Sequence, residues 1–278
     1  MVSGRAGGGI VLGGDRPVEL VVPAGYAGEA LPLVLSLHGY GVAPEAHDAT
    51  LGLSPRVDAR RFFLLTPAGT PEAGAGPAFW NATDACCDFA ASGVDDVAYL
   101  TGLVEEAAQH VNLDRARVYV VGLSNGAFMA HRLACDAGER FAGIAAIGGV
   151  APLDPEACPA ASPVSVLQVH GTEDAIVRYA GGDLRAVARS ARVHAHPGAE
   201  ESALRWALRG GCAATPRVGP RLDLDANVPG PETRPASFPG CAEGVSVVLW
   251  RLEGSRHVPA FGPALADQLL DVLFEGSR

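Results

Sequence analysis

The sequence predicts an α/β fold in which a mainly parallel sheet is covered by helices on both faces. Apolar, β-branched runs typical of buried strands alternate along the chain with segments of helical periodicity. Of the 278 residues, 48% are hydrophobic and 19% are charged, so the chain can bury the core of a large domain and is not disordered. There is no internal repeat and no linker, and we expect residues 1–278 to form a single domain.

The apolar runs predict seven strands, over Val18–Val22, Leu31–Leu37, Phe62–Thr66, Val118–Gly122, Ile144–Gly148, Val164–Val169 and Val245–Arg251. Helical periodicity predicts four helices, over Asp95–His110, Asn125–Ala134, Glu200–Leu208 and Pro263–Phe274. Between the last two helices, the Gly- and Pro-rich stretch from Gly210 to Gly244 is expected to be a long surface excursion.

Charge and hydropathy exclude two classes of partner. The formal net charge is −10 and the arginines are scattered, so we expect no binding to nucleic acid. No window approaches 18 continuous apolar residues, which argues against a membrane span. The first residues lack the apolar segment of a signal peptide, although a leader removed earlier would leave no trace. We expect a monomer.

The chain has six cysteines, none in a C-x-x-C spacing typical of zinc sites: Cys86, Cys87, Cys135, Cys158, Cys212 and Cys241. An even count in one domain favours disulfides and a secreted or extracytoplasmic location, the alternative being buried free thiols in a cytosolic protein. Cys212 and Cys241 flank the long excursion and are expected to pair, and Cys135–Cys158 is the next pairing. Cys86 and Cys87 would remain, and this pairing is the least secure because adjacent residues rarely bridge comfortably.

The segment Gly122-Leu123-Ser124-Asn125-Gly126 fits the pattern G-x-S-x-G. The pattern alone is weak, but a β-branched run precedes it and a good helix former, Ala127–Ala134, follows it. A strand, a tight turn and a helix are the context in which this motif exposes a nucleophilic serine. We therefore expect Ser124 to be a nucleophile, the alternative being an ordinary turn with a capping serine.

An apolar strand also ends in His38-Gly39-Tyr40-Gly41. In α/β-hydrolase folds the loop after this strand and the residue after the nucleophile each supply one backbone N–H to an oxyanion hole. The expected donors are the amides of Tyr40 and Asn125, and the Tyr40 side chain should border the substrate pocket. A plain loop with two glycines is the alternative.

The catalytic order in this fold is serine, acid, histidine. Asp174 follows the strand Val164–Val169 directly and is the expected acid, with Glu173 as runner-up. His257 lies on a loop after the last strand and is the expected base. His170 is expected to brace the acid loop, and His47 to face solvent. The chemistry is then acyl transfer through an acyl-enzyme, with no cofactor and no metal.

Together these residues make the chain resemble the polyhydroxybutyrate depolymerase and feruloyl esterase family, from about Leu31 to Phe261. The resemblance rests on Leu35–Gly41, Phe79–Cys87, Ser92–Val97, Gly122–Gly126, Arg132–Cys135, His170–Asp174 and Trp206 before Gly211-Cys212. It implies the same Ser124, Asp174 and His257, and esters of the feruloyl, polyhydroxyalkanoate or aromatic polyester type as substrates. The position of Trp80 in the family pattern suggests that it lines the cleft, the alternative being a core tryptophan.

The segment around His257 departs from this family. A run of glycines usually precedes the catalytic histidine and Trp-Pro-Gly follows it, whereas this chain has Gly254-Ser255-Arg256-His257-Val258-Pro259. The substrate rim is therefore expected to differ, with Arg256 as an unusual member. A peptidase or acyltransferase, or a non-catalytic binding protein of the same fold, are the alternative functions.

A large lid is not expected. The connection 151–163 is short and rich in proline, and Cys158 can pin it down. An open, pre-formed cleft that accepts bulky or polymeric esters follows. The chain ends about one helix after His257, so we expect no appended polymer-binding domain.

Overall fold

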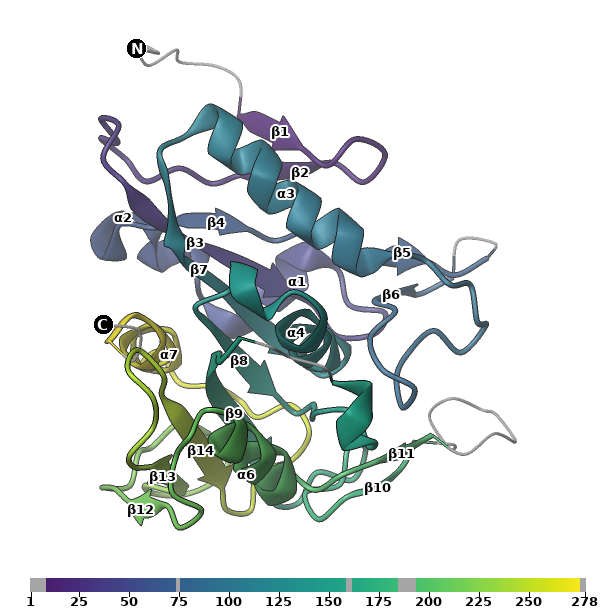
Figure 1. The fold of residues 1–278 in the computed structure, drawn as a ribbon, viewed down its shortest axis with the longest axis vertical. Helices are drawn as coiled ribbons and strands as arrows, with labels where there is room; N and C mark the ends of the chain where they lie inside the picture. The colour runs from purple at the N-terminus through teal and green to yellow at the C-terminus, as the bar shows by residue number, and fades with distance from the viewer. Residues whose placement is uncertain (1–8, 74–75, 159–161, 185–193, 276–278) are drawn as a thin grey trace.

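The computed structural model describes residues 9–73, 76–158, 162–184 and 194–275. Their central element is an eight-stranded sheet with the order β12-β13-β14-β9-β8-β7-β3-β4 (Figure 1). The strands are parallel from β14 to β4, and β13 and β12 continue the sheet in antiparallel orientation. In chain order their bounds are β3 Leu31–Leu37, β4 Phe63–Leu65, β7 Leu113–Leu123, β8 Gly143–Ile147, β9 Ser165–Gly171, β12 Arg217–Val218, β13 Thr233–Phe238 and β14 Val247–Leu252.

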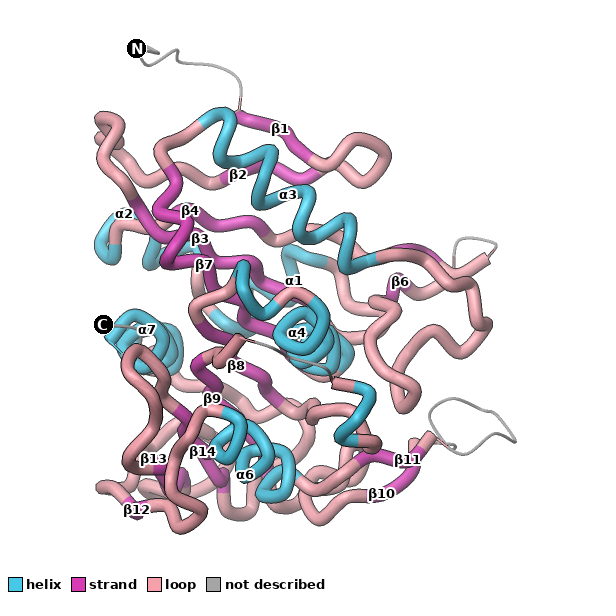
Figure 2. The backbone as a smooth tube through the Cα atoms, viewed as in Figure 1, coloured by secondary structure: helices cyan, strands magenta, loops and turns pink. Residues whose placement is uncertain are grey.

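Helices cover both faces of this sheet (Figure 2). Side chains of α3 (Asp96–His110), α4 (Asn125–Asp136) and α6 (Ala199–Arg209) share one hydrophobic core with one face of the sheet. Side chains of α1 (Pro44–Leu51), α2 (Val57–Arg60) and α7 (Leu265–Glu275) form a second core on the other face. The strands alternate accordingly: Leu33 and Leu35 belong to the first core, and Val34 to the second. This arrangement confirms the predicted fold class.

The remaining elements are short. They are the pair β1 (Ile10–Leu12) and β2 (Val18–Leu20), the pair β5 (Thr70–Pro71) and β6 (Ala78–Phe79), the pair β10 (Gly182–Asp183) and β11 (Ala195–His196), and the 3₁₀ turns η1 (Ser54–Arg56), η2 (Gly138–Arg140) and η3 (Pro155–Ala157). No helix in the described ranges is both long and apolar enough to span a bilayer.

Each of the seven predicted strands and four predicted helices has a counterpart, with shifted ends. The stretch Gly210–Gly244 is largely exposed, as expected of a surface excursion, but it also contains β12 and β13, and β13 pairs with β14 along six residues. Pro235 interrupts the β-strand pattern of β13 in the sequence. It is tolerated because its ring nitrogen lies on the side of β12, which pairs only with Ala236 and Ser237, so no strand pairing requires an N–H at Pro235.

Disulfides join Cys86 to Cys87, Cys135 to Cys158 and Cys212 to Cys241. The Cys135–Cys158 bond ties the end of α4 to the turn η3, and Cys212–Cys241 ties the end of α6 to the loop after β13. Each of these two disulfides joins segments that connect strands of the sheet, so each reduces the conformational entropy of the unfolded chain.

The Cys212–Cys241 bond should therefore contribute measurably to stability. The double variant Cys212→Ser/Cys241→Ser should lose about 3–4 kcal/mol of unfolding free energy in denaturant titrations, because the closed loop no longer limits the unfolded ensemble. Titration of the unreduced, denatured protein should find no free thiol. Six reactive thiols would contradict the disulfide assignment.

Candidate active site

Three side chains from distant parts of the sequence form one row of hydrogen bonds. The Oγ of Ser124 lies 2.8 Å from Nε2 of His257, and Nδ1 of His257 lies 2.7 Å from Oδ2 of Asp174. Ser124 follows β7, Asp174 follows β9 and His257 follows β14. Because these strands are parallel, their carboxyl ends meet at one edge of the sheet, and the three loops converge there.

Ser124 occupies a strained turn between β7 and α4. Its backbone has φ 56° and ψ −116°, a conformation that a residue with a side chain rarely adopts. The turn requires glycine on both sides. A Cβ at Gly122 would overlap the carbonyl of Gly126, and a Cβ at Gly126 would overlap the carbonyl of Leu37. The sequence pattern G-x-S-x-G is thus explained by backbone contact, which leaves the serine side chain half-buried at the sheet edge.

Asp174 is held as a buried carboxylate. Its Oδ1 accepts hydrogen bonds from the amides of Ile176 and Val177, each at 2.8 Å. Burial by itself raises the pKa of Asp174, but the hydrogen bonds from His170 and His257 outweigh burial and hold its pKa well below the usual range. His170 lies with Nε2 3.3 Å from Asp174 Oδ2, in keeping with its expected bracing of the acid loop.

The loops that carry acid and base are fixed to each other. The amide of Glu173 donates to the carbonyl of Ser255 at 2.9 Å. The Glu173 side chain is exposed, so it is Asp174 rather than the runner-up Glu173 that lies against His257. The side chain of His257 itself is 12% exposed and remains accessible from solvent.

The glycine loop after β3 lies directly beside the serine. A Cβ at Gly39 would stand 3.4 Å from the Cβ of Ser124. The loop is braced by Trp80, whose indole N–H donates to the carbonyl of His38 at 3.1 Å. The buried Asn125 side chain exchanges two hydrogen bonds with the backbone of Trp80, at 2.7 and 2.9 Å. These contacts hold the glycine loop, which contains Tyr40, next to Ser124, and Asn125 follows Ser124 directly in the chain.

Two sequence expectations about individual residues are wrong. Trp80 is fully buried, so its ring belongs to the core that supports the glycine loop and does not line a cleft. His47 does not face solvent, because it is buried in α1 with Nε2 2.9 Å from Oγ of Ser36. The other two candidates for substrate contact are accessible: Tyr40 is half-buried with its hydroxyl donating to Glu72, and Arg256 is exposed next to His257.

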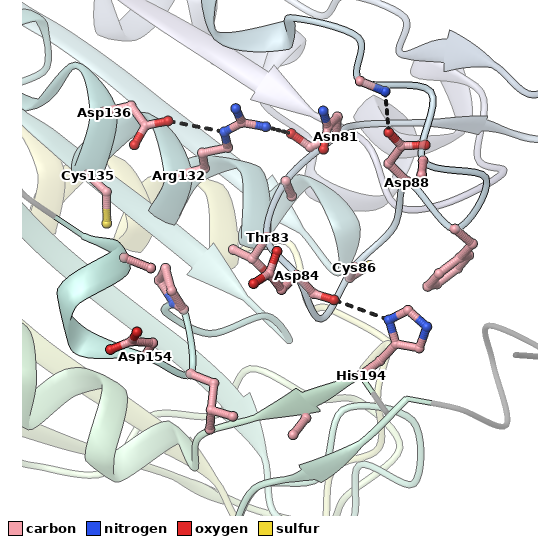
Figure 3. Close-up of a pocket in the computed structure, with 18 residues that line it drawn as sticks. Asn81, Thr83, Asp84, Cys86, Asp88, Arg132, Cys135, Asp136, Asp154 and His194 are labelled. Atoms are coloured by element: carbon pink, nitrogen blue, oxygen red, sulfur yellow. Dashed lines mark hydrogen bonds and ion pairs between the residues drawn. The ribbon is translucent and has the colours of Figure 1, made fainter. Parts of the chain in front are cut away.

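A cavity of about 710 Å³ lies beyond the loop that follows Trp80 (Figure 3). Its walls come from that loop, from the last turns of α4, from residues 152–157 and from β11, and none of Ser124, Asp174 and His257 lines it. Phe89 connects it with the glycine loop, because its ring packs against both Tyr40 at 5.7 Å and His194 at 5.3 Å between centroids.

Sequence reasoning missed Gly148 and Gly149, which follow β8 and lie against the backbone of Ser124 and the ring of His257. A Cβ at Gly149 would stand 2.7 Å from the backbone oxygen of Ser124, and one at Gly148 would stand 3.4 Å from the His257 ring. The available signal was a pair of glycines at the end of a predicted strand.

Comparison with known proteins places this geometry in a family. A putative esterase NocK from Nocardia uniformis subsp. tsuyamanensis is 30% identical over 62% of this chain and 49% of its own length. Feruloyl esterase B from Piromyces equi is 26% identical over 89% of this chain and 43% of its own length, so the chain spans about half or less of these relatives. The structure of an acetyl xylan esterase from Aspergillus awamori shares the fold, with a TM-score of 0.67 at 16% identity over 96% of this chain and 99% of that one. The family model for phospholipases and carboxylesterases matches residues 26–192, more than half of the sequence, and the chain therefore belongs to the phospholipase/carboxylesterase family.

Proposed function

We propose that this chain is a serine ester hydrolase with Ser124 as nucleophile, His257 as base and Asp174 as the acid that orients the base. The observation that carries the proposal is the continuous row of hydrogen bonds from Ser124 Oγ through both ring nitrogens of His257 to Asp174. A serine on a strained turn, a histidine within reach of its proton and a buried carboxylate behind the histidine are the parts that nucleophilic acyl transfer requires.

In the proposed reaction, His257 Nε2 takes the proton of the Ser124 hydroxyl while Oγ attacks the ester carbonyl. The tetrahedral intermediate collapses, and His257 returns the proton to the departing alcohol. Water then adds to the acyl-enzyme, its proton passing to His257, and the carboxylic acid leaves as the serine regains its hydrogen. Asp174 holds the Nδ1–H tautomer and stabilises the charged imidazole, for which its low pKa keeps it ionised. The reaction needs no cofactor.

The oxyanion is proposed to be held by the backbone N–H groups of Tyr40 and Asn125. Support comes from Gly39, which packs against Ser124, and from Asn125, which begins α4 directly after the nucleophile. The amino-terminal end of a helix carries partial positive charge, which favours negative charge developing at this point.

We propose bulky or polymeric esters as substrates, of the feruloyl, polyhydroxyalkanoate or aromatic polyester type. Ile176 and Val258, on the loops of the acid and the base, expose 43% and 50% of their surface and offer apolar contacts to an acyl group. The segment 152–158 forms only the turn η3 and is tied to α4 by Cys135–Cys158, so it does not act as a helical lid. The relative named feruloyl esterase agrees with this class of substrate.

The proposal includes an oxidising, extracytoplasmic location and a monomeric enzyme of one catalytic domain. Three disulfides argue for the location, since cytosolic thiols are kept reduced. The single domain is supported by the two hydrophobic cores, which pack against opposite faces of the same sheet.

The proposed triad predicts a steep loss of activity on substitution. Ser124→Ala and His257→Ala should each lower kcat on a p-nitrophenyl ester at least about 10³-fold, because the residues act as one unit. Asp174→Asn should be severe, since an amide favours the wrong tautomer of His257, whereas the exposed Glu173→Gln is the matched control. Loss of activity in Glu173→Gln with activity retained in Asp174→Asn would overturn the acid assignment.

The base also predicts the pH dependence. Neutral imidazole is required to accept the serine proton, so kcat/KM should fall on the acid side of the profile, where the base is protonated. The depressed pKa of Asp174 keeps this carboxylate ionised throughout, so the acid limb should correspond to one proton, with a slope of one in log kcat/KM against pH. A profile that stays flat to about pH 4 is incompatible with a histidine base.

The proposed absence of a helical lid predicts ordinary saturation kinetics. The rate on a short-chain ester should rise smoothly with concentration, because the described segment 152–158 is tied to α4 and does not have to move before substrate binds. Rates measured on both sides of the solubility limit of the ester test this. A sharp increase at the limit would indicate a lid and contradict the proposal.

A further inference from the structure

A row of buried hydrogen bonds runs from α6 to the loop after β8, outside the proposed triad. The indole Nε1–H of Trp206 donates to Nδ1 of His131 at 3.0 Å. Nε2 of His131 lies 3.0 Å from Oε1 of Gln168, and Nε2 of Gln168 donates to the carbonyl of Gly149 at 2.7 Å. His131 and Gln168 are fully buried and Trp206 is 3% exposed, so water does not compete for these bonds.

The direction of every bond in this row is determined by chemistry. An indole N–H can only donate, so Nδ1 of His131 must accept and its hydrogen is carried on Nε2. Nε2–H then donates to the Gln168 oxygen, which turns the amide NH₂ toward Gly149. Burial lowers the pKa of His131 to about 4, so the ring is neutral and this pattern is stable around neutrality.

The end of the row is the glycine pair that contacts both Ser124 and His257. Gly149 lies so close to the backbone of Ser124 and to Ala127 of α4 that a Cβ there would stand 2.7 Å from each. Gly148 lies next to the His257 ring. The same loop is held from its other end, because the amide of Ala151 donates to Oγ of Ser202 in α6 at 2.9 Å. A shift of this loop would therefore change the separation of serine and histidine.

We propose that Gln168 and His131 are positioning residues, which hold the Gly148–Gly149 loop and through it the reactive geometry of Ser124 and His257. This inference rests on the proposed function. Both residues are fully buried and act through other groups. His131 orients the Gln168 amide, and Gln168 holds the Gly149 carbonyl by a hydrogen bond. Misplacing reacting groups by about 1 Å can cost about 10²-fold in rate, so a small displacement is sufficient for a large effect.

The decisive experiment compares Gln168→Leu and Gln168→Met with Ser165→Ala. Leucine and methionine keep much of the bulk, and both remove the acceptor for His131 and the donor to Gly149. Ser165 is a buried polar residue at the start of the same strand, hydrogen-bonded to Gly244 and Ser246, and serves as matched control. Active sites are counted with a fluorophosphonate probe, and kcat and KM are expressed per labelled site.

Both Gln168 variants should lose at least about tenfold in kcat with KM unchanged within about twofold, and Ser165→Ala should keep its kcat. A purely structural role would lower the melting temperature but leave kcat per labelled site at the wild-type value, and that result would overturn the inference. The proposed function fails separately, if Ser124→Ala remains active.

A second pair of variants keeps the inference testable if the Gln168 variants do not fold. His131→Gln retains an acceptor for Trp206 and a donor for Gln168, whereas His131→Phe retains the stacking on Trp206 and loses both hydrogen bonds. Kcat per labelled site should be preserved in His131→Gln within about threefold and fall at least about tenfold in His131→Phe. Equal values in the two variants would contradict the positioning role.

Discussion

The close backbone contact between the start of α4 and the ends of β3 and β7 is the constraint on which the site depends. Gly122 and Gly126 allow the helix to approach the sheet so closely that any side chain at these positions would overlap a carbonyl group. This approach holds Ser124 at a positive φ of 56°, and the amide of Ser124 is held by the carbonyl of Ile147 at 2.7 Å. The strain at one residue is maintained by contacts from the three strands β3, β7 and β8 and the helix α4.

Electrostatics extends this mechanical arrangement. Asp174 is buried but accepts hydrogen bonds from two amides and two histidines, so its charge is retained in a place where an isolated carboxylate would take up a proton. The same parallel strands that bring the three loops together supply those donors, because the loop after β9 folds back over the carboxylate. The geometry and the charge of the candidate site therefore have one origin, the common edge of the parallel strands.

Much of this could be predicted from the sequence, because strong local signals coincide with the elements that form the sheet. Ser124, Asp174 and the loop of His257 each come directly after an apolar run in the sequence. In all three cases the apolar run is a buried strand of the sheet, so the strand and the residue after it could be predicted together. The burial of Trp80 and His47 could not be predicted, since aromatic and imidazole groups suit both cores and clefts. The strand β13 was not predicted, because Pro235 and the glycines on either side of the segment are typical of a loop. It is a strand because it pairs with β14. Nor does a local pattern indicate that Gln168 and His131, far apart in the chain, meet at Gly149.

The two strands β12 and β13, which the sequence concealed, also determine how the sheet ends. The outermost strands of the central sheet are β12, with two residues, and β4, with three. The free edge of β4 is partly covered, because Leu64 forms a β-bridge with Val21. Without β13, the apolar strand β14 would expose unpaired backbone N–H and C=O groups to other molecules. In the structure, β13 pairs with β14 along its whole length. Such short borders give a neighbouring chain little template for adding a strand, which should protect the folded protein against edge-to-edge aggregation at high concentration.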